Sequence, residues 1–439
     1  MSLGKLTVNG RQDGFLCDGK PFFWFADTCW SAFTSITEDD WDYYLTRRAE
    51  QGMNVLQINT LPQWDRCLPD LGIWPYASED GVHFDWSAPN QEYWERARRM
   101  CRAAVEHGIR PALVLAWCNY VPGTWGSAIA ERTGASCMPV EDMVAHVNRV
   151  VEELGEFDPV YVVTGDTDFK TDEAIAYYEQ VLAATVAAAP DSLRCMHINR
   201  GNRTIPERYL DRLDFYMFQP GHNYEGQPEA WKLPEDFRAN YPVKPMINSE
   251  PCYEQMGASR HVYWRFTAQD CRASAWSSIL AGASAGITYG AHGVWNWQTS
   301  QSRGSVLGEG FDMPFRWQEC LQFAGVWDFG LIGHVLRGLG ATSADGAAAV
   351  EPAQGLLDDA REAIRVARAG ERVVVYLPRA TAVKLKLEGG AAAWNAVAFD
   401  LENKRVANLQ VTAADVDGEV RVAQHPFEHD ALLVVSPAQ

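Results

Sequence analysis

Four acidic residues follow short apolar runs that are typical of buried strands. They are Asp27, Asp166, Asp168 and Glu250. A carboxylate is costly to bury without a partner, so several of them at one edge of a sheet need a chemical reason. Glycosidic cleavage supplies one, because one acid protonates the leaving oxygen while a second attacks the sugar or positions water. The pattern therefore indicates a glycosidase.

Glu250 is the strongest catalytic candidate among these acids. The apolar run 243–247 predicts a buried strand, and Pro251 prevents the chain after Glu250 from continuing the strand ladder. We therefore expect Glu250 at the C-terminal mouth of a strand, which is where parallel α/β barrels carry their chemistry.

Asp166 is the predicted partner of Glu250, and it follows Gly165 after the strand predicted for 160–164. Acids near helix starts commonly act as caps, and this is the alternative for Asp166, although we favour catalysis. Asp168 fits a cap or a support for its neighbour. Asp27 fits either an acceptor for backbone donors or a group that binds sugar hydroxyls.

Aromatic and polar residues at the predicted strand ends are suited to holding a sugar. Indole faces stack on the apolar C–H face of a sugar ring. The tryptophans at or just past strand ends are Trp30, Trp117, Trp295 and Trp297, although a single tryptophan is about as often part of a core. Polar side chains at this level either bind hydroxyls or satisfy loop backbone. They are Asn59, Asn119, Asn199, Tyr216, Gln219, His222 and His292.

The elements that must position these residues alternate between strand and helix eight times. The strands are predicted at 22–28, 54–60, 110–117, 160–164, 193–199, 215–219, 243–247 and 286–290. This alternation favours parallel strands with helical crossovers, and at this number a closed (β/α)8 TIM barrel of the α/β class. An open doubly wound sheet is the alternative, but no G-x-G-x-x-G follows the first strand. A short hairpin, at 6–9 and 15–17, precedes the barrel.

The composition changes near residue 340. All but one of the 17 tryptophans and all ten cysteines precede residue 330. Beyond 345 the hydrophobic period changes to two, which predicts a small antiparallel β-sandwich. Its strands are predicted at 363–369, 372–377, 382–387, 396–400, 406–411, 419–424 and 431–436. We therefore divide the chain into a catalytic domain with its hairpin, 1–338, and a β-sandwich domain, 345–439.

Composition and charge exclude several other classes. The net charge is -19 and no basic cluster tracks phosphates, which argues against nucleic acid and membrane as partners. The cysteines show no C-x-x-C and no metal-ligand spacing, so we expect reduced core thiols, no metal, no cofactor and a cytoplasmic location. Secretion stays open if a leader has been removed, and a homo-oligomer is compatible with the sequence.

Other chemistries are less well supported. The sequence has no G-x-S-x-G, P-loop, H-E-x-x-H or kinase motif. The best metal-ligand set that can be assembled is His222, His292 and Asp27. It ranks well below the paired acids.

Five ordered motifs point to a known family. They are FFWFADTCW at 22–30, QGMNVLQ at 51–57, TGD at 164–166, SEPCYE at 249–254 and TYGAHGVW at 288–295. Together they resemble the apiosidase-like glycoside hydrolases, glycoside hydrolase family 140 and its relatives, over about residues 5–335. The run RVVVYLP at 372–378 resembles the small β-domain that follows in this group, often labelled a collagen-binding domain.

This resemblance implies roles for four residues. Asp166 becomes the general acid/base and Glu250 the nucleophile, with Asp27 and His292 near the substrate. The motif after the fourth strand reads Thr-Gly-Asp. In this it differs from the wider superfamily of retaining barrel glycosidases, which has Asn-Glu at this place. We predict a retaining glycoside hydrolase that cleaves a plant- or microbial-type oligosaccharide. The alternative is a catalytically inactive barrel that only binds carbohydrate.

Overall fold

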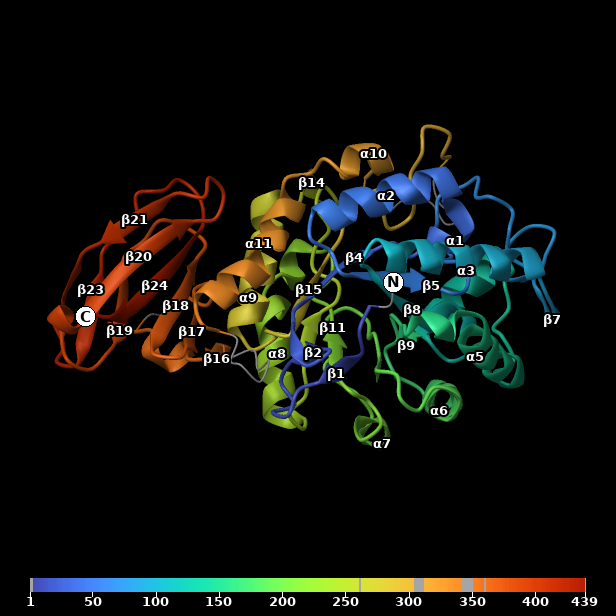
Figure 1. Ribbon diagram of the computed structural model, residues 1–439, viewed down its shortest axis with the longest axis horizontal. Helices are drawn as coiled ribbons and strands as arrows, with labels where there is room; N and C mark the ends of the chain where they lie inside the picture. Colours follow the sequence, from blue (N-terminus) through green and yellow to red (C-terminus); the bar gives the residue numbers. More distant parts are fainter. Residues whose placement is uncertain (1–2, 260–261, 304–311, 342–349, 359–360, 439) are drawn as a thin grey trace.

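The computed structural model describes residues 3–259, 262–303, 312–341, 350–358 and 361–438. A helix-covered barrel forms the larger part, and antiparallel strands from the C-terminal part of the chain lie against one side of it (Figure 1). The described part holds no helix that is both long and apolar enough to cross a membrane.

The barrel is a single sheet of eight parallel strands in the order β10-β9-β8-β5-β4-β15-β12-β11. Its strands are β4 (Trp24–Thr28), β5 (Val55–Asn59), β8 (Arg110–Trp117), β9 (Val160–Gly165), β10 (Arg194–Cys195), β11 (Tyr216–Phe218), β12 (Met246–Asn248) and β15 (Gly286–Tyr289). Every strand residue is buried, as expected for parallel strands covered by helices. The predicted TIM barrel is confirmed.

The seam between β10 and β11 closes the barrel through contacts outside the regular ladder. The backbone N–H of Asp214 donates to the carbonyl of Arg194 at 2.9 Å, and Gly201 N–H donates to the carbonyl of Gln219 at 3.0 Å. The Gln219 side chain adds a hydrogen bond from Nε2 to the carbonyl of Ile198 at 3.0 Å. Gln219 therefore fixes the seam at the C-terminal mouth.

Helices follow most of the barrel strands and surround the sheet (Figure 1). They are α1 (Ala32–Ser35), α2 (Glu38–Glu50), α3 (Gln91–Glu106), α4 (Trp125–Ala130), α5 (Val140–Leu154), α6 (Asp172–Ala188), α7 (Glu207–Leu210), α8 (Glu229–Asn240), α9 (Ala268–Leu280), α10 (Trp317–Cys320) and α11 (Gly325–Gly338). Thr37, Asn90, Thr171 and Thr267 cap α2, α3, α6 and α9 by accepting a backbone N–H of the first turn. The loop after β5 adds the pair β6 (Tyr76–Ala77) and β7 (Asp85–Pro89).

A three-stranded antiparallel sheet covers the N-terminal end of the barrel. It consists of β1 (Leu6–Val8), β2 (Phe15–Cys17) and β3 (Lys20–Phe22). The ring of Phe15 packs edge-on against Phe215 at 5.2 Å and lies 6.3 Å from Trp24, the first residue of β4. The predicted strand 22–28 is thus two strands, because Phe22 pairs with β2 whereas Trp24 enters the barrel.

The C-terminal strands form the predicted sandwich. A six-stranded sheet contains β16 (Val350–Pro352), β17 (Arg365–Ala369), β18 (Arg372–Leu377), β24 (Ala431–Pro437), β20 (Trp394–Asp400) and β21 (Val406–Leu409), and a three-stranded sheet contains β19 (Val383–Lys386), β23 (Glu419–Val422) and β22 (Val411–Ala413). The strand predicted for 406–411 divides at Gln410, so its two halves belong to different sheets.

The six-stranded sheet contributes one face to each of two cores. Val374 and Tyr376 of β18 belong to the core that is continuous with the barrel, whereas Val373 and Val375 pack with the three-stranded sheet. Side chains alternate between the faces of a strand, so the run RVVVYLP serves both cores. Because the barrel and the sandwich share a core, the division at 338 and 345 stays a prediction.

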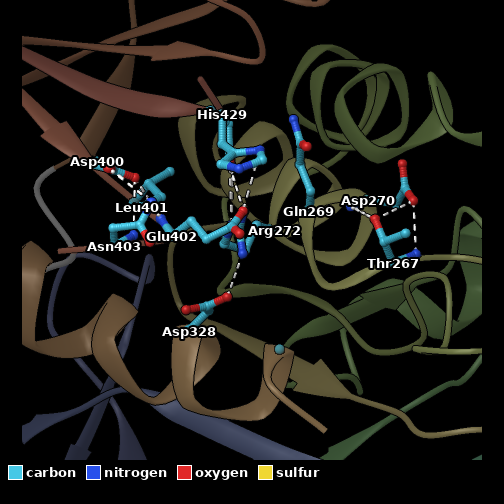
Figure 2. Close-up of polar contacts among 12 residues, drawn as sticks. Thr267, Gln269, Asp270, Arg272, Asp328, Asp400, Leu401, Glu402, Asn403 and His429 are labelled. Atoms are coloured by element: carbon cyan, nitrogen blue, oxygen red, sulfur yellow. Dashed lines mark hydrogen bonds and ion pairs between the residues drawn. The ribbon is translucent and has the colours of Figure 1, made fainter. Parts of the chain in front are cut away.

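Arg272 of α9 joins the barrel to the sandwich at a buried ionic cluster (Figure 2). Its side chain is 3% exposed. Its Nη1 lies 2.6 Å from Asp328 of α11, and its Nη2 lies 2.7 Å from Asp430 and 3.1 Å from Glu402 in the sandwich. Tyr376 also donates to Asp430 at 3.3 Å. One guanidinium therefore neutralises carboxylates from both parts of the chain.

Replacing Arg272 by methionine should lower the free energy of unfolding by about 3–5 kcal/mol, because a buried Asp430 would lose its cation. Urea denaturation followed by circular dichroism measures this change. The control is Arg316→Met, since Arg316 and Glu319 form an exposed ion pair whose loss should change stability little. Equal midpoints for the two variants would contradict the importance of the cluster.

Candidate active site

Glu250 stands two residues beyond the end of β12, inside a cluster of three donors. Its side chain is 11% exposed. Tyr253 donates its hydroxyl to Oε1 at 2.8 Å, and His222 Nε2 lies 2.8 Å from the same oxygen. His197 Nε2 lies 3.1 Å from Oε2. Oε1 is therefore held by two donors, whereas Oε2 lies within ion-pair distance of His197, whose Nε2 makes no aligned hydrogen bond.

The donors around Glu250 determine its protonation. Burial alone would raise the pKa of this carboxyl, but the hydrogen bonds and charges of His197 and His222 outweigh burial and hold the pKa below its ordinary value. Glu250 is consequently an ionised carboxylate throughout the neutral pH range. An ionised, oriented carboxylate is suited to attack an electrophilic carbon.

Asp166 follows directly on β9 and has the opposite electrostatic setting. Burial raises the pKa of its carboxyl well above the ordinary value, and the negative charge of Glu250 raises it further. A hydrogen bond from Gln219 Nε2 to Oδ1, at 2.7 Å, and the charge of Arg200 oppose this rise without reversing it. Asp166 is thus suited to hold a proton, which a general acid requires.

His197 connects the two acids. Its Nδ1 accepts the backbone N–H of Asp166 at 3.2 Å, so in the neutral ring the proton is on Nε2, which faces Glu250. The imidazole is completely buried and stacks on the indole of Trp117, with the planes at 27°. The backbone of Asp166 therefore helps to orient the imidazole that faces Glu250.

Trp117, the last residue of β8, explains the glycine in the Thr-Gly-Asp motif. A Cβ placed on Gly165 would lie 2.1 Å from Cε3 of the Trp117 ring. No other residue fits at 165 while this indole keeps its place. Asp166 itself has a φ of 54°, in the left-handed region, which sets the direction of its side chain.

Several predicted polar residues have buried atoms that the protein does not satisfy. Among the described residues, Asn59 Nδ2 and Oδ1, Asn119 Oδ1 and Trp117 Nε1 have no hydrogen-bond partner. They stand at the C-terminal ends of β5 and β8 or just beyond. Buried polar groups normally have partners, and these atoms lack one among the described protein atoms although solvent does not reach them.

Trp30 and Trp295 lie beside the acids, but as buried residues. Trp30 donates its indole N–H to Tyr253 Oη at 3.2 Å, and its ring is 5.2 Å from that of Trp117. Trp295 lies 6.4 Å from the Tyr253 ring. Trp30 is 2% exposed and Trp295 6%, so these rings support the site more than they offer open faces.

Asp27 lies away from solvent, which favours the first of its two expected roles, an acceptor for protein donors, over contact with sugar hydroxyls. The carboxylate is completely buried and is held by Arg48 Nε at 2.6 Å, the Tyr44 hydroxyl at 2.7 Å and the N–H of Thr28 at 3.0 Å. Its oxygens are thus occupied by donors from α2 and its own strand. Asp27 is a structural ion-pair residue.

Tyr216 lies at the end of the barrel opposite the acids, so its position does not suit the expected role in substrate binding. It is the first residue of β11, and its hydroxyl donates to the carbonyl of Pro242 at 3.2 Å. It lines a cavity at the N-terminal end of the barrel, opposite the mouth. The sequence correctly predicts that Tyr216 belongs to this strand. However, Tyr216 is the first residue of β11, whereas a substrate-binding residue was expected at the C-terminal end.

The remaining predicted residues have other neighbours. Trp297 stacks on Trp317 at 4.5 Å. His292 is completely buried, with Nε2 3.0 Å from the carbonyl of Asp312 and Nδ1 accepting the indole N–H of Trp295. Asp168 pairs with Lys170 at 3.2 Å. Trp297 and His292 are therefore buried against neighbouring protein groups.

The alternative metal set does not assemble. His222 contacts Glu250, Asp27 contacts Arg48, and His292 contacts the Asp312 carbonyl. In the part of the chain that the structure describes, no three His, Cys, Asp or Glu side chains gather as a metal site would require. All ten cysteines are free thiols, and eight of them are buried.

A family model for the apiosidase-like catalytic domain matches residues 12–342. The chain belongs to the apiosidase-like family. It is accordingly a glycosidase, as the paired acids predict. The matched region contains both Asp166 and Glu250, and it ends close to the last residue of α11.

Solved structures show that the fold of this apiosidase-like protein extends over its whole length. A glycoside hydrolase with 22% sequence identity has a TM-score of 0.76, covering 99% of this chain and 97% of the other. A family 5 glycoside hydrolase from Bacteroides vulgatus, with 21% identity, has a TM-score of 0.78 and coverages of 99% and 93%. A comparison with curated proteins gave no match.

Sequence reasoning missed His197 and the role of Tyr253 in this apiosidase-like site. His197 falls within the strand predicted for 193–199. A single histidine in a strand does not reveal from the sequence that its side chain will contact a carboxylate. Tyr253 lies in the SEPCYE motif, three residues after Glu250, and this spacing is the one available signal. Gln219 was expected to bind sugar, but its amide holds Asp166.

Asp166→Asn should stabilise the apiosidase-like protein at neutral pH. Because the folded state raises the pKa of Asp166, its contribution to stability is full below the unfolded pKa of about 3.9 and is lost as pH rises through the folded pKa. The variant carries no charge, so its advantage in Tm should grow as pH rises from about 4 toward the raised pKa of the folded state. Differential scanning calorimetry measures this difference.

The control for this experiment is Asp168→Asn, whose carboxylate contacts Lys170. This variant should show no gain at high pH. A Tm advantage of Asp166→Asn that stays constant with pH would contradict the raised pKa.

Proposed function

We propose that the protein is a retaining glycosidase in which Glu250 is the nucleophile and Asp166 the general acid/base. The observation that supports this assignment is the opposite shift of the two carboxyl pKa values, downward for Glu250 and upward for Asp166. A glycosidase that works with two acids needs one ionised and one protonated carboxyl group, whether it retains or inverts configuration, and the retaining assignment follows the family resemblance. The surroundings of the two acids favour that division.

In the first step Asp166 donates its proton to the leaving oxygen while Glu250 attacks the anomeric carbon. The glycosidic C–O bond breaks, and a covalent glycosyl ester forms on Glu250. The ester has no negative charge, so the repulsion that raises the pKa of Asp166 disappears. Asp166 is by then ionised and has a lower pKa, which suits it to act as a base.

In the second step water attacks the anomeric carbon as Asp166 takes its proton. The bond to Glu250 breaks, the sugar leaves with its original configuration, and both acids return to their starting protonation states. Tyr253, His222 and His197 receive the returning negative charge on Glu250. Preorganised donors of this kind need no rearrangement during the reaction.

The substrate in this proposal is a plant- or microbial-type oligosaccharide. Asn59, Asn119 and the indole N–H of Trp117 supply buried atoms that lack protein partners and match sugar hydroxyls. Asn199, partly exposed in the loop after β10, is a further hydroxyl contact in this proposal.

Glu250→Gln should reduce kcat by at least about a thousand-fold, because removing a catalytic nucleophile removes the covalent pathway. The assay uses a panel of aryl glycosides and plant-cell-wall oligosaccharides, with the anomer of the first product followed by NMR. Retained configuration supports the nucleophile, and an inverted product overturns it. An inactive wild-type enzyme that binds members of the panel would indicate a carbohydrate-binding protein.

Asp166→Asn is the complementary variant in the same assay. Its kcat/KM, which reports the first chemical step, should fall strongly on substrates with poor leaving groups and little on a dinitrophenyl glycoside, whose leaving group needs no proton. Equal losses on both substrates would contradict the role of Asp166 as the acid.

Arg200→Gln should move the alkaline limb of the kcat/KM profile to higher pH. The charge of Arg200 lowers the pKa of Asp166, so its removal lets that pKa rise and keeps the acid protonated to higher pH. The control is Arg421→Gln in β23, another exposed arginine, which lies in the sandwich. An alkaline limb that does not move, or that moves equally in both variants, would assign the limb to another group.

A further inference from the structure

Among the solvent-exposed aromatic side chains on loops at the barrel mouth, Tyr224 and Trp264 lie next to each other. Tyr224 is 45% exposed and Trp264 is 39% exposed. Their ring centroids are 6.3 Å apart, with an angle of 54° between the planes. Tyr224 follows β11, and Trp264 follows β12 on the strand β14 (Val262–Arg265). These neighbouring parallel strands end at the same edge of the barrel.

The loops that carry this aromatic pair also carry two donors to the candidate nucleophile. Tyr224 is two residues after His222, whose Nε2 contacts Glu250 at 2.8 Å. Two residues span at most about 7 Å of chain, so Tyr224 starts close to that contact. The hairpin of β13 (Gly257–Ser259) and β14 begins four residues after Tyr253, the other donor to Oε1 of Glu250.

Contacts at the base of the hairpin hold Trp264 in place. Phe266 N–H donates to the carbonyl of Met256 at 2.9 Å, and Gln255 N–H donates to the carbonyl of Phe266 at 2.8 Å. Trp264 packs edge-on against the buried ring of Phe266 at 5.3 Å. Arg265 donates to the carbonyls of Gln255 and Met313. The indole is thus anchored by its edge, while a large part of it stays exposed.

Exposure separates this pair from the tryptophans next to the acids. Trp30 is 2% exposed and Trp117 is 5% exposed, so their faces are already covered by protein. Exposed aromatic rings that are fixed beside a catalytic mouth commonly mark a ligand site. Tyr224 and Trp264, by contrast, form a pair of neighbouring rings that keep a large part of their surface open.

We propose that Tyr224 and Trp264 form a distal sugar subsite, which binds a residue of the oligosaccharide beyond the two sugars joined by the scissile bond. The ring faces would stack on the C–H face of that distal sugar, as aromatic side chains do with apolar surfaces. This inference rests on the proposed glycosidase function. It implies a preference for chains longer than a disaccharide.

The experiment compares Trp264→Ala and Tyr224→Ala with the wild-type enzyme on two probes. One probe is the plant-cell-wall oligosaccharide that the wild type cleaves fastest, and the other is the aryl glycoside of the sugar it releases. Each variant should lose about three- to ten-fold in kcat/KM on the oligosaccharide and keep its rate on the aryl glycoside. The short probe does not reach the subsite.

Matched controls are Trp327→Ala in α11 and Tyr43→Ala in α2. Trp327 is 45% exposed and Tyr43 is 48% exposed, close to the values of the subsite pair. Neither control should change the ratio of kcat/KM on the oligosaccharide to kcat/KM on the aryl glycoside. The subsite is overturned if Trp264→Ala and Tyr224→Ala leave that ratio unchanged, or if they lower both rates equally.

Failure of the proposed function gives a different result. If the wild type cleaves no member of the panel, binding of the same oligosaccharides to Glu250→Gln is measured by calorimetry. Weaker binding after adding Trp264→Ala supports the subsite without catalysis. Unchanged binding, or no binding of any oligosaccharide, overturns it.

Discussion

Two carboxyl groups in one buried barrel mouth cannot both be ionised without a large electrostatic cost. This protein divides the charge by giving nearly all the donors to one acid. Glu250 receives Tyr253, His222 and His197, whereas Asp166 receives Gln219. The chemistry follows from this unequal distribution, because the acid with many donors stays ionised and the acid with few retains a proton.

The unequal distribution of donors depends on the seam between β10 and β11, where the barrel closes without a regular strand ladder. Only short strands, β10 and β11, stand at the two edges of the eight-stranded sheet, and contacts outside the ladder join them. Gln219 and His197 both come from this seam and both contact the acids. The Gln219 side chain therefore both joins the seam and holds Asp166.

The sequence allows most of the fold to be predicted, because its apolar periods are local. It also places Glu250 and Asp166 correctly at strand ends, since Pro251 and Gly165 mark where those strands stop. Side-chain direction is less predictable. Asp27 lies at a strand end as expected but faces Arg48 on α2, and Tyr216 occupies the wrong end of a three-residue strand. His197 contacts an acid 53 residues away in the chain, which no local pattern encodes.

The close fit of Gly165 against Trp117 has a consequence for sequence divergence. A larger residue at 165 collides with the indole, and a smaller residue at 117 leaves a void between β8 and β9. The two positions form an epistatic pair, so neither is free to change alone. In this chain, replacing Thr-Gly-Asp by a motif with a larger residue at 165 would therefore require a second change, at 117.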